Sequence, residues 1–212
     1  MRSKLFIALL WLAALPSFAF EGTVKQLYKN YNGTGTDVTM TWYIKGSNCR
    51  IDMTTSTKEA KGTTVLLIDA TSQKLKMYND DATAPTRVYY DISLADIASS
   101  AADVSVAKTT DTKTIQGYKC EKYQATNAHG AYDIWFTKDI AVDWSAIKDF
   151  FKESTEIQTL AKEGIKGFPL LTEAKDKGAT MSDNAITVQA LSSATFTVPA
   201  DYKLFTNTAA KK

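Results

Sequence analysis

The chain has 212 residues, with 25 lysines and arginines against 23 aspartates and glutamates, so its formal net charge at neutral pH is +2. Two of the basic residues, Arg2 and Lys4, lie in a segment that we expect to be removed, and the rest of the chain is then formally neutral. A neutral chain has no basic excess to attract a phosphate backbone. We therefore expect no nucleic-acid partner.

Residues 1–19 have the pattern of a secretory signal peptide. Arg2 and Lys4 precede an apolar run from Leu5 to Leu15, and Ser17-Phe18-Ala19 offers small residues to a signal peptidase. The run has about 11 residues, whereas a transmembrane helix needs roughly 20. We expect cleavage after Ala19 and a mature protein that does not span the membrane. Its expected location is the periplasm or the medium outside the cell.

The mature chain is long enough for one domain with a sizeable core, and we place that domain at residues 20–206, followed by a disordered polar tail at 207–212. Much of it has the alternation typical of β-strands. The apolar residues of the most regular run are Val38, Met40, Trp42 and Ile44. Gly46 and Ser47 lead from it to a second run at 49–53, so the two runs form either one bent strand or a hairpin.

The segment from residue 115 to residue 137 predicts another hairpin, with aromatic residues on both faces. Cys120 and Tyr123 fall on opposite sides of its first strand, residues 127–130 have turn chemistry, and Trp135 lies in its second strand. The short turns along the chain predict antiparallel pairing.

One principal helix is predicted after this hairpin. Asp143 or Ser145 can serve as its N-cap, and apolar residues recur at helical spacing up to a stop at Gly164. Together with about nine to eleven strands, this helix predicts an α+β protein with a curved antiparallel sheet.

The mature chain keeps two cysteines, Cys49 and Cys120. Disulfides persist in oxidising compartments, so a bridge between the two is expected, and two buried thiols are the alternative. Two thiols and one histidine without ligand-like spacing predict no metal site, and we expect no cofactor.

Catalytic residue patterns are missing from the sequence. The single histidine, His129, lies in the turn sequence Asn-Ala-His-Gly, where exposure to water is the expected state. The serine pairs at 99–100 and 192–193 lack the Gly-x-Ser-x-Gly context of a nucleophile elbow. We therefore expect that the protein is not an enzyme.

Four motifs carry a resemblance to known proteins. They are Cys-Arg-Ile-Asp-Met at 49–53, Ile-Gln-Gly-Tyr-Lys-Cys-Glu-Lys-Tyr at 115–123, Ile-Trp-Phe-Thr-Lys-Asp-Ile at 134–140 and Lys-Gly-Phe-Pro-Leu at 166–170. With the signal peptide, they resemble an uncharacterised family of exported bacterial proteins known only as a domain of unknown function. That family more distantly resembles the LolA and LolB lipoprotein carriers, which implies a half-barrel: a strongly curved sheet wrapped around one helix, with a concave face that accepts acyl chains.

This resemblance leads to a functional hypothesis, a carrier or sensor that binds a lipid or a lipoprotein acyl chain. The residues expected near the concave surface are Val38, Met40, Trp42, Ile44, Tyr90 and Trp135. The alternative for each of them is ordinary core packing. A second hypothesis is a protein-interaction module of the cell envelope without a small ligand, because aromatic residues are favoured at interfaces. Its expected contact residues are Tyr28, Tyr31, Tyr43, Tyr89 and Trp144.

Overall fold

The computed structural model describes residues 20–30, 35–55, 62–81, 83–93, 103–146, 148–149, 151, 154–175 and 178–206. The strands are β1 (Glu21–Tyr28), β2 (Val38–Lys45), β3 (Asn48–Thr55), β4 (Thr63–Asp69), β5 (Lys74–Asp80), β6 (Val88–Ser93), β7 (Ser105–Ile115), β8 (Tyr118–Asn127), β9 (Gly130–Thr137), β10 (Phe168–Ala174), β11 (Gly178–Val188) and β12 (Lys203–Leu204). The helical elements are the 3-10 turns η3 (Trp144–Ala146) and η4 (Ser193–Phe196) and the α-helix α1 (Thr155–Lys162). The predicted signal peptide and tail lie outside the described residues.

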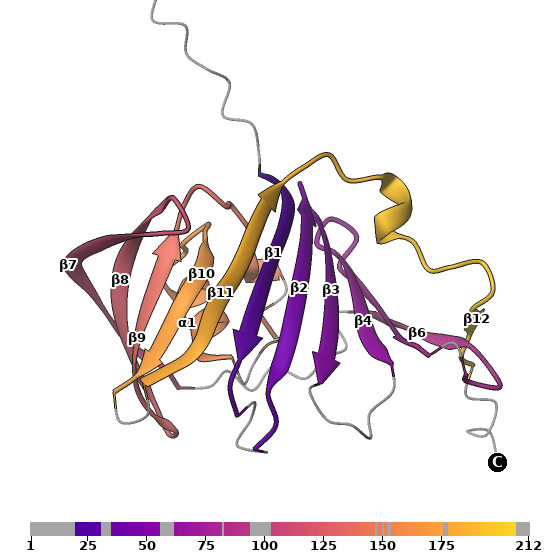
Figure 1. Ribbon diagram of the computed structural model, residues 1–212, viewed down its shortest axis with the longest axis horizontal. Coiled ribbons are helices and arrows are strands. Elements are labelled where there is room, and N and C mark those ends of the chain that lie inside the picture. Colours follow the sequence, from indigo (N-terminus) through magenta and orange to yellow (C-terminus); the bar gives the residue numbers. More distant parts are fainter. Residues whose placement is uncertain are drawn as a thin grey trace, which may run out of the picture.

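All twelve strands belong to one open sheet with the order β12-β6-β5-β4-β3-β2-β1-β11-β10-β9-β8-β7. Neighbouring strands are antiparallel, except that β12 runs parallel to β6. Figure 1 shows the twisted sheet with α1 on one side of it. We call this side the inner face and the opposite side the outer face.

The predicted α+β class, a half-barrel of nine to eleven strands around one principal helix, is therefore wrong. The described residues form a sheet of twelve strands, and their one α-helix has eight residues. The strand count was too low partly because β7 has few apolar residues. An edge strand that is exposed on both faces gives no hydrophobic alternation to detect.

The helix also begins later than predicted. Its N-cap is Ser154, whose hydroxyl accepts a hydrogen bond from the backbone N–H of Ile157, and neither Asp143 nor Ser145 caps it. Asp143 instead accepts from the backbone N–H of Ser145 at the start of η3. The side-chain amide of Gln158 donates to the carbonyl oxygens of Lys148 and Phe151, so these groups are satisfied without a helical ladder.

The two regular runs near residue 46 form a hairpin. Trp42 lies directly opposite Ile51, and Ile44 lies opposite Cys49. Gly46 makes the turn with a φ of 58°, a backbone conformation that glycine adopts without steric cost. This settles the choice between a bent strand and a hairpin that the sequence left open.

A small second core lies on the outer face, separate from the main core of the inner face. It contains Val65, Leu67 and Tyr78 from β4 and β5, and it is covered by Tyr202 from the end of the chain. Residues 189–206, which we call the C-terminal strap, reach it by crossing the outer face. The strap explains why β4 is apolar on both of its faces: one face packs in the main core and the other packs under the strap.

Hydrogen bonds and ion pairs hold the strap along its length. Near its start, the backbone N–H of Leu191 donates to Glu21 Oε1 at 2.5 Å, and Lys45 Nζ donates to the Leu191 carbonyl oxygen at 2.6 Å. Near its end, the Tyr202 hydroxyl donates to the carbonyl oxygen of Asn79 at 2.8 Å.

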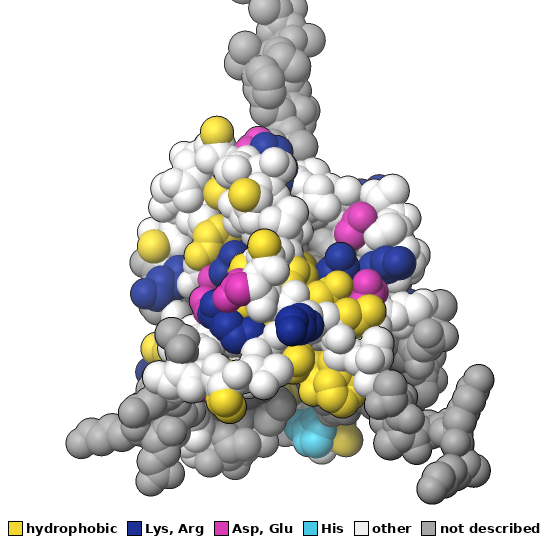
Figure 2. Space-filling view, turned by 90° about the vertical axis from the view of Figure 1, so that its right-hand side faces the viewer, with side chains coloured by type: hydrophobic (Ala, Val, Ile, Leu, Met, Phe, Trp, Pro, Cys, Tyr) yellow, Lys and Arg dark blue, Asp and Glu magenta, His cyan; other side chains and the backbone are white. Residues whose placement is uncertain are grey.

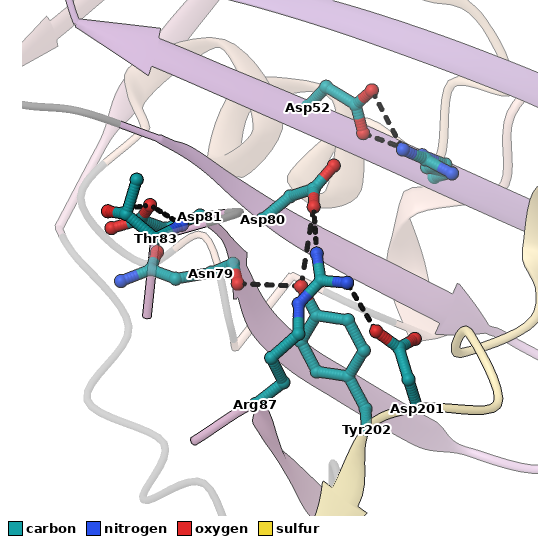
Figure 3. A network of polar contacts seen from close by, with 9 residues as sticks. Asp52, Asn79, Asp80, Asp81, Thr83, Arg87, Asp201 and Tyr202 are labelled. Atoms are coloured by element: carbon teal, nitrogen blue, oxygen red, sulfur yellow. Dashed lines mark hydrogen bonds and ion pairs between the residues drawn. The ribbon is translucent and has the colours of Figure 1, made fainter. Parts of the chain in front are cut away.

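Arg87 joins the strap to the body of the sheet. Its guanidinium pairs with Asp80 and with Asp201, and it lies 4.5 Å from the centre of the Tyr202 ring, as Figure 3 shows. The hydrogen bond to Asp201 raises the pKa of Arg87, and a guanidinium is charged at neutral pH in any case.

Candidate functional site

An apolar row crosses the inner face at right angles to the strands. Each residue of the row lies directly opposite the next on the neighbouring strand, and together they are Val24, Trp42, Ile51, Leu66, Met77 and Tyr90. The row ends at Phe205, whose ring centre lies 5.0 Å from that of Tyr90. Six strands and the strap thus contribute to one continuous apolar feature.

Aromatic rings enclose Trp42, the second residue of the row, and we call Val24 and Trp42 the closed end. Trp144 and Phe168 meet the Trp42 ring edge to face at centroid distances of 5.6 and 5.4 Å, and Phe151 lies at 5.9 Å. Trp42 is only 2% exposed as a result. The chain's own side chains therefore fill the space around Trp42 and leave no room there for a ligand.

The other three predicted ligand residues on β2 are buried as well. Val38, Met40 and Ile44 alternate as expected, point to the inner face and are buried with Trp42 in the main core. The strand pattern is thus confirmed, and the described structure accounts for all four side chains by core packing.

The opposite end of the row is open. Tyr90 is 39% exposed, and Phe205 near the end of the strap is 47% exposed. Leu204 is 48% exposed as well, but it lies opposite Tyr89 and so belongs to the outer face. We call Tyr90 and Phe205 the open end. Figure 2 looks onto the side of the molecule that carries β6 and β12, where hydrophobic side chains gather among lysine and arginine side chains. Of the six predicted ligand residues, Tyr90 alone is both on the inner face and exposed.

Trp135 lies on the outer face, away from the row, because it alternates with the inward-facing Ile134 and Phe136. Lys113 Nζ lies 3.9 Å from the centre of its ring, and Lys122 Nζ lies at 5.7 Å. The indole N–H donates to Glu173 at 3.2 Å. Trp135 is thus buried in the same core as the four predicted residues of β2, but its ring lies against two lysines and not in the apolar row.

A hollow of about 170 Å³ lies beside the closed end, between η3 and α1. Its lining includes Trp144, Leu160 and Ile165 together with the polar Asp143 and Lys166, which form an ion pair at 3.1 Å. The hydrogen bond from Ser145 and the pairing with Lys166 lower the pKa of Asp143. Ligand pockets for drug-sized molecules are roughly 300–1,000 Å³, so this hollow is too small for a long acyl chain.

Cys49 and Cys120 are both buried, and no disulfide joins these two described residues. They lie on β3 and β8, which are six places apart in the strand order, whereas a disulfide needs Cα atoms within about 7 Å. The predicted bridge is thus absent from the structure, and the alternative of buried thiols applies. Burial raises the pKa of the Cys49 thiol to about 12.

The aromatic residues expected for an interface are mostly not free surface residues. Trp144 is fully buried, and Tyr28, Tyr43 and Tyr89 are half-buried. Tyr31 lies outside the described residues. Leu204 and Phe205 were not predicted as contact residues, although Tyr202, Leu204 and Phe205 place three large apolar side chains shortly before the polar tail.

Two further searches concern only the described part of the chain. No group of three His, Cys, Asp or Glu side chains there is arranged to hold a metal ion. No helix in the described ranges is long and apolar enough to cross a membrane. His129 is exposed in the β8–β9 turn, as its sequence context predicted.

The described residues form an almost entirely β protein with one open sheet. Residues 20–202 match a family described as "Domain of unknown function (DUF4412)", and because this match covers most of the chain, the chain belongs to that family. The resemblance to an uncharacterised family is thereby confirmed, whereas the resemblance to LolA and LolB is not confirmed. None of the curated proteins compared with the chain matches it.

Two solved structures of PNGF-II, in the C2 and P21 space groups, are similar to this chain. Both are 12% identical to it and cover 88% of it, with TM-scores of 0.48 and 0.45. The matched part is 30% and 32% of those chains, so this chain spans about a third of their length. Similarity at this level supports no conclusion about function.

Proposed function

We propose that this chain is an exported protein of the bacterial cell envelope that acts as a protein-interaction module, with the open end as its contact surface. The carrying observation is the exposed ring pair of Tyr90 and Phe205 at one edge of the sheet. Exposed aromatic residues that lie together are characteristic of binding surfaces, because burial of such rings contributes strongly to affinity.

The state of the closed end also supports this proposal. The residues expected to hold an acyl chain on β2 are already packed against the chain's own side chains, Trp42 being enclosed by three aromatic rings. A ligand there would have to displace these rings. A partner at the open end covers exposed surface and displaces nothing in the main core.

An apolar small ligand, such as a lipid or a lipoprotein acyl chain, is the second candidate function. The same open end favours it, because Met77 and Ile92 lie half-buried beside Tyr90 and can adapt to an apolar chain. Each methylene buried there would contribute about 0.8 kcal/mol. Such a ligand would lie on the surface and not in an enclosed cavity.

Site-specific photo-crosslinking in intact cells tests the proposal. A photoreactive amino acid replaces Phe205 in one variant and Val188 in a control variant, since Val188 is 71% exposed and lies outside the open end. We expect a discrete protein adduct from position 205 and none from position 188. The purified partner should bind the wild-type protein and the Val188→Ser variant but not the Tyr90→Ser/Phe205→Ser variant.

The other outcomes decide between the two candidates. A lipid adduct at position 205, identified by mass spectrometry, would replace the protein partner with the apolar ligand. Identical adducts at positions 205 and 188, or unchanged partner binding by the Tyr90→Ser/Phe205→Ser variant, would overturn the open end as the contact surface.

A further inference from the structure

The two edges of the sheet differ in how far they are protected against an added strand. β7 forms one edge, and its pairing with β8 is interrupted by an irregularity between Lys108 and Thr112. Charged side chains lie along it: Lys108 pairs with Glu121, and Asp111 pairs with Lys122. Bulges and charged residues are the usual protection of an edge strand, so β7 is a poor template for a further strand.

β6 has less of this protection, because Asp91 is its only charged residue. Its pairing with β5 is regular from Tyr89 to Ser93, with no bulge. On its other side, β12 pairs only with Val88 and Tyr89, and no described strand pairs with Tyr90 to Ser93. We call this part of the strand, residues 90–93, the β6 edge.

The contacts of the strap show which backbone groups point outward from β6. The backbone N–H of Lys203 donates to the carbonyl oxygen of Arg87 at 3.0 Å, and that of Phe205 donates to the carbonyl oxygen of Tyr89 at 2.8 Å. Outward groups alternate along a strand, so Asp91 supplies the next outward N–H and C=O. The hydrogen bond of Phe205 is the last one from the described part of the strap to β6, and none from that part reaches Asp91.

The side chains around the β6 edge differ on the two faces of the sheet. On the inner face, Tyr90 and Phe205 form the exposed ring pair, with Ile92 half-buried beside them. On the outer face, Asp91 is exposed and lies directly opposite Lys76. An added strand would therefore meet apolar rings on one side and a polar surface on the other.

We propose that the β6 edge binds an extended peptide segment of a partner protein by strand addition, with the segment's backbone paired to Asp91 and an apolar side chain packed against Tyr90 and Phe205. This inference rests on the proposed interaction function and names the class of partner. The pairing of β12 with Val88 and Tyr89 supports it, because this edge already accepts an extended segment in the folded chain. Main-chain hydrogen bonds supply affinity in such complexes, and alternate side chains supply specificity.

The length and the side chains of the β6 edge determine the length and the residue pattern expected of the partner segment. Four residues of β6 offer pairing over roughly 13 Å, which matches a segment of about four or five residues. Every second residue of the segment should be apolar, so that it faces the ring pair of Tyr90 and Phe205. The intervening residues should be polar, and a basic residue is favoured opposite Asp91.

Peptide display tests the inference with the full folded protein. A library of random decapeptides is selected on the wild-type protein, and dissociation constants of the selected peptides are then measured by titration calorimetry. Asp91→Pro removes the outward N–H and leaves the groups that face β5, a position where an edge strand tolerates proline. Asp91→Ala is the matched control, because it removes the carboxylate and keeps the N–H.

We expect selected peptides with alternating apolar residues that bind Asp91→Pro at least about tenfold more weakly than wild type, with Asp91→Ala within about threefold, since one lost hydrogen bond has an effect of this order. N-methylation of the peptide at alternate residues should weaken binding to the wild-type protein, and N-methylation at the residues between should not. This measurement needs no variant and remains decisive if Asp91→Pro folds poorly.

Three results would overturn strand addition. They are the absence of any selected binder, equal losses from Asp91→Pro and Asp91→Ala, and loss of binding upon N-methylation that is independent of position. If peptide binding depends on Tyr90 and Phe205 but not on the Asp91 N–H, strand addition fails while the interaction function at the open end stands. If Tyr90→Ser/Phe205→Ser also leaves the partner bound, the proposed function itself fails.

Discussion

The closed end and the open end of the apolar row have the same sequence pattern but opposite environments. Trp42 and Tyr90 are both aromatic residues on the inward-facing positions of regular strands, and they belong to one cross-strand row. Trp42 is 2% exposed and Tyr90 is 39% exposed. The difference comes from segments far away in the chain, which cover one end and leave the other.

The cover of the closed end consists of Trp144, Phe151 and Phe168, which reach Trp42 from η3, from the segment before α1 and from β10. At the open end, the strap supplies only Phe205. Strand alternation thus identifies which residues face inward, but burial depends on what lies over them. A binding surface is therefore expected where inward-facing apolar residues continue along the row but no other segment of the chain covers them.

The largest expected effect is a difference between the two ends in how much an alanine substitution lowers the free energy of unfolding. Trp42→Ala should lower the free energy of unfolding by about 3–5 kcal/mol, because it leaves a cavity among packed rings. Tyr90→Ala should lower it by less than about 1 kcal/mol, since much of the ring is already in water. Urea unfolding followed by circular dichroism measures both values. Similar losses at the two positions would show that the open end is part of the packed core.

Trp42→Phe refines this comparison. The indole N–H of Trp42 is buried and has no hydrogen-bond partner among the described residues. Phenylalanine removes that unsatisfied donor and keeps most of the aromatic contact, so its effect should be well below that of Trp42→Ala.

Thiol reactivity tests the closure of the same region. Cys49 lies two residues before Ile51 of the row, and burial raises its thiol pKa from 9.0 to about 12. At pH 8 this reduces the thiolate on the order of a thousandfold. We expect Cys49 to react with iodoacetamide only after denaturation, as measured by peptide mass spectrometry. Rapid labelling of Cys49 in the folded protein would mean that the closed end opens in solution.

A smaller effect is expected from the helix next to the cover. Ser154→Ala removes the N-cap of α1 and should lower the free energy of unfolding by about 1 kcal/mol. Ser192→Ala is the matched control, because Ser192 caps the short and exposed η4 in the same way. Its effect should be clearly smaller, and an equal effect would contradict a role of α1 in holding the closed end.

Parts of the fold that depend on local pattern could be predicted from the sequence. The alternation at Val38 to Ile44, the turn at Gly46 and the hairpin around residues 127–130 agree with β2, β3, β8 and β9. Each of these features is decided by neighbouring residues. The end of the helix just before Gly164 agrees with the prediction, whereas its start was wrong, because apolar spacing alone did not show that Ser154 would cap it.

Features that depend on contacts between distant parts of the chain could not be predicted from the sequence. Trp135 was expected near the concave surface, but alternation along β9 turns its ring to the outer face, against Lys113 and Lys122. The outer side of β4 is apolar, and nothing in the local pattern indicated that residues more than 120 positions later would cover it. Of the candidate site, only Tyr90 was predicted, since Phe205 reaches it through the path of the strap.

The smallest predicted effect concerns the anchoring of the strap, which carries Phe205 to the open end. The backbone N–H of Leu191 and the ammonium of Lys45 lower the pKa of Glu21 below its ordinary value of 4.5. A carboxylate with a lowered pKa stabilises the fold above about pH 4.5, and this contribution is lost as the pH falls through the lower value. Unfolding curves of wild type and Glu21→Gln should therefore differ at pH 6 and converge towards pH 3. A difference that persists or grows in acid would show that the Glu21 contact does not hold the strap.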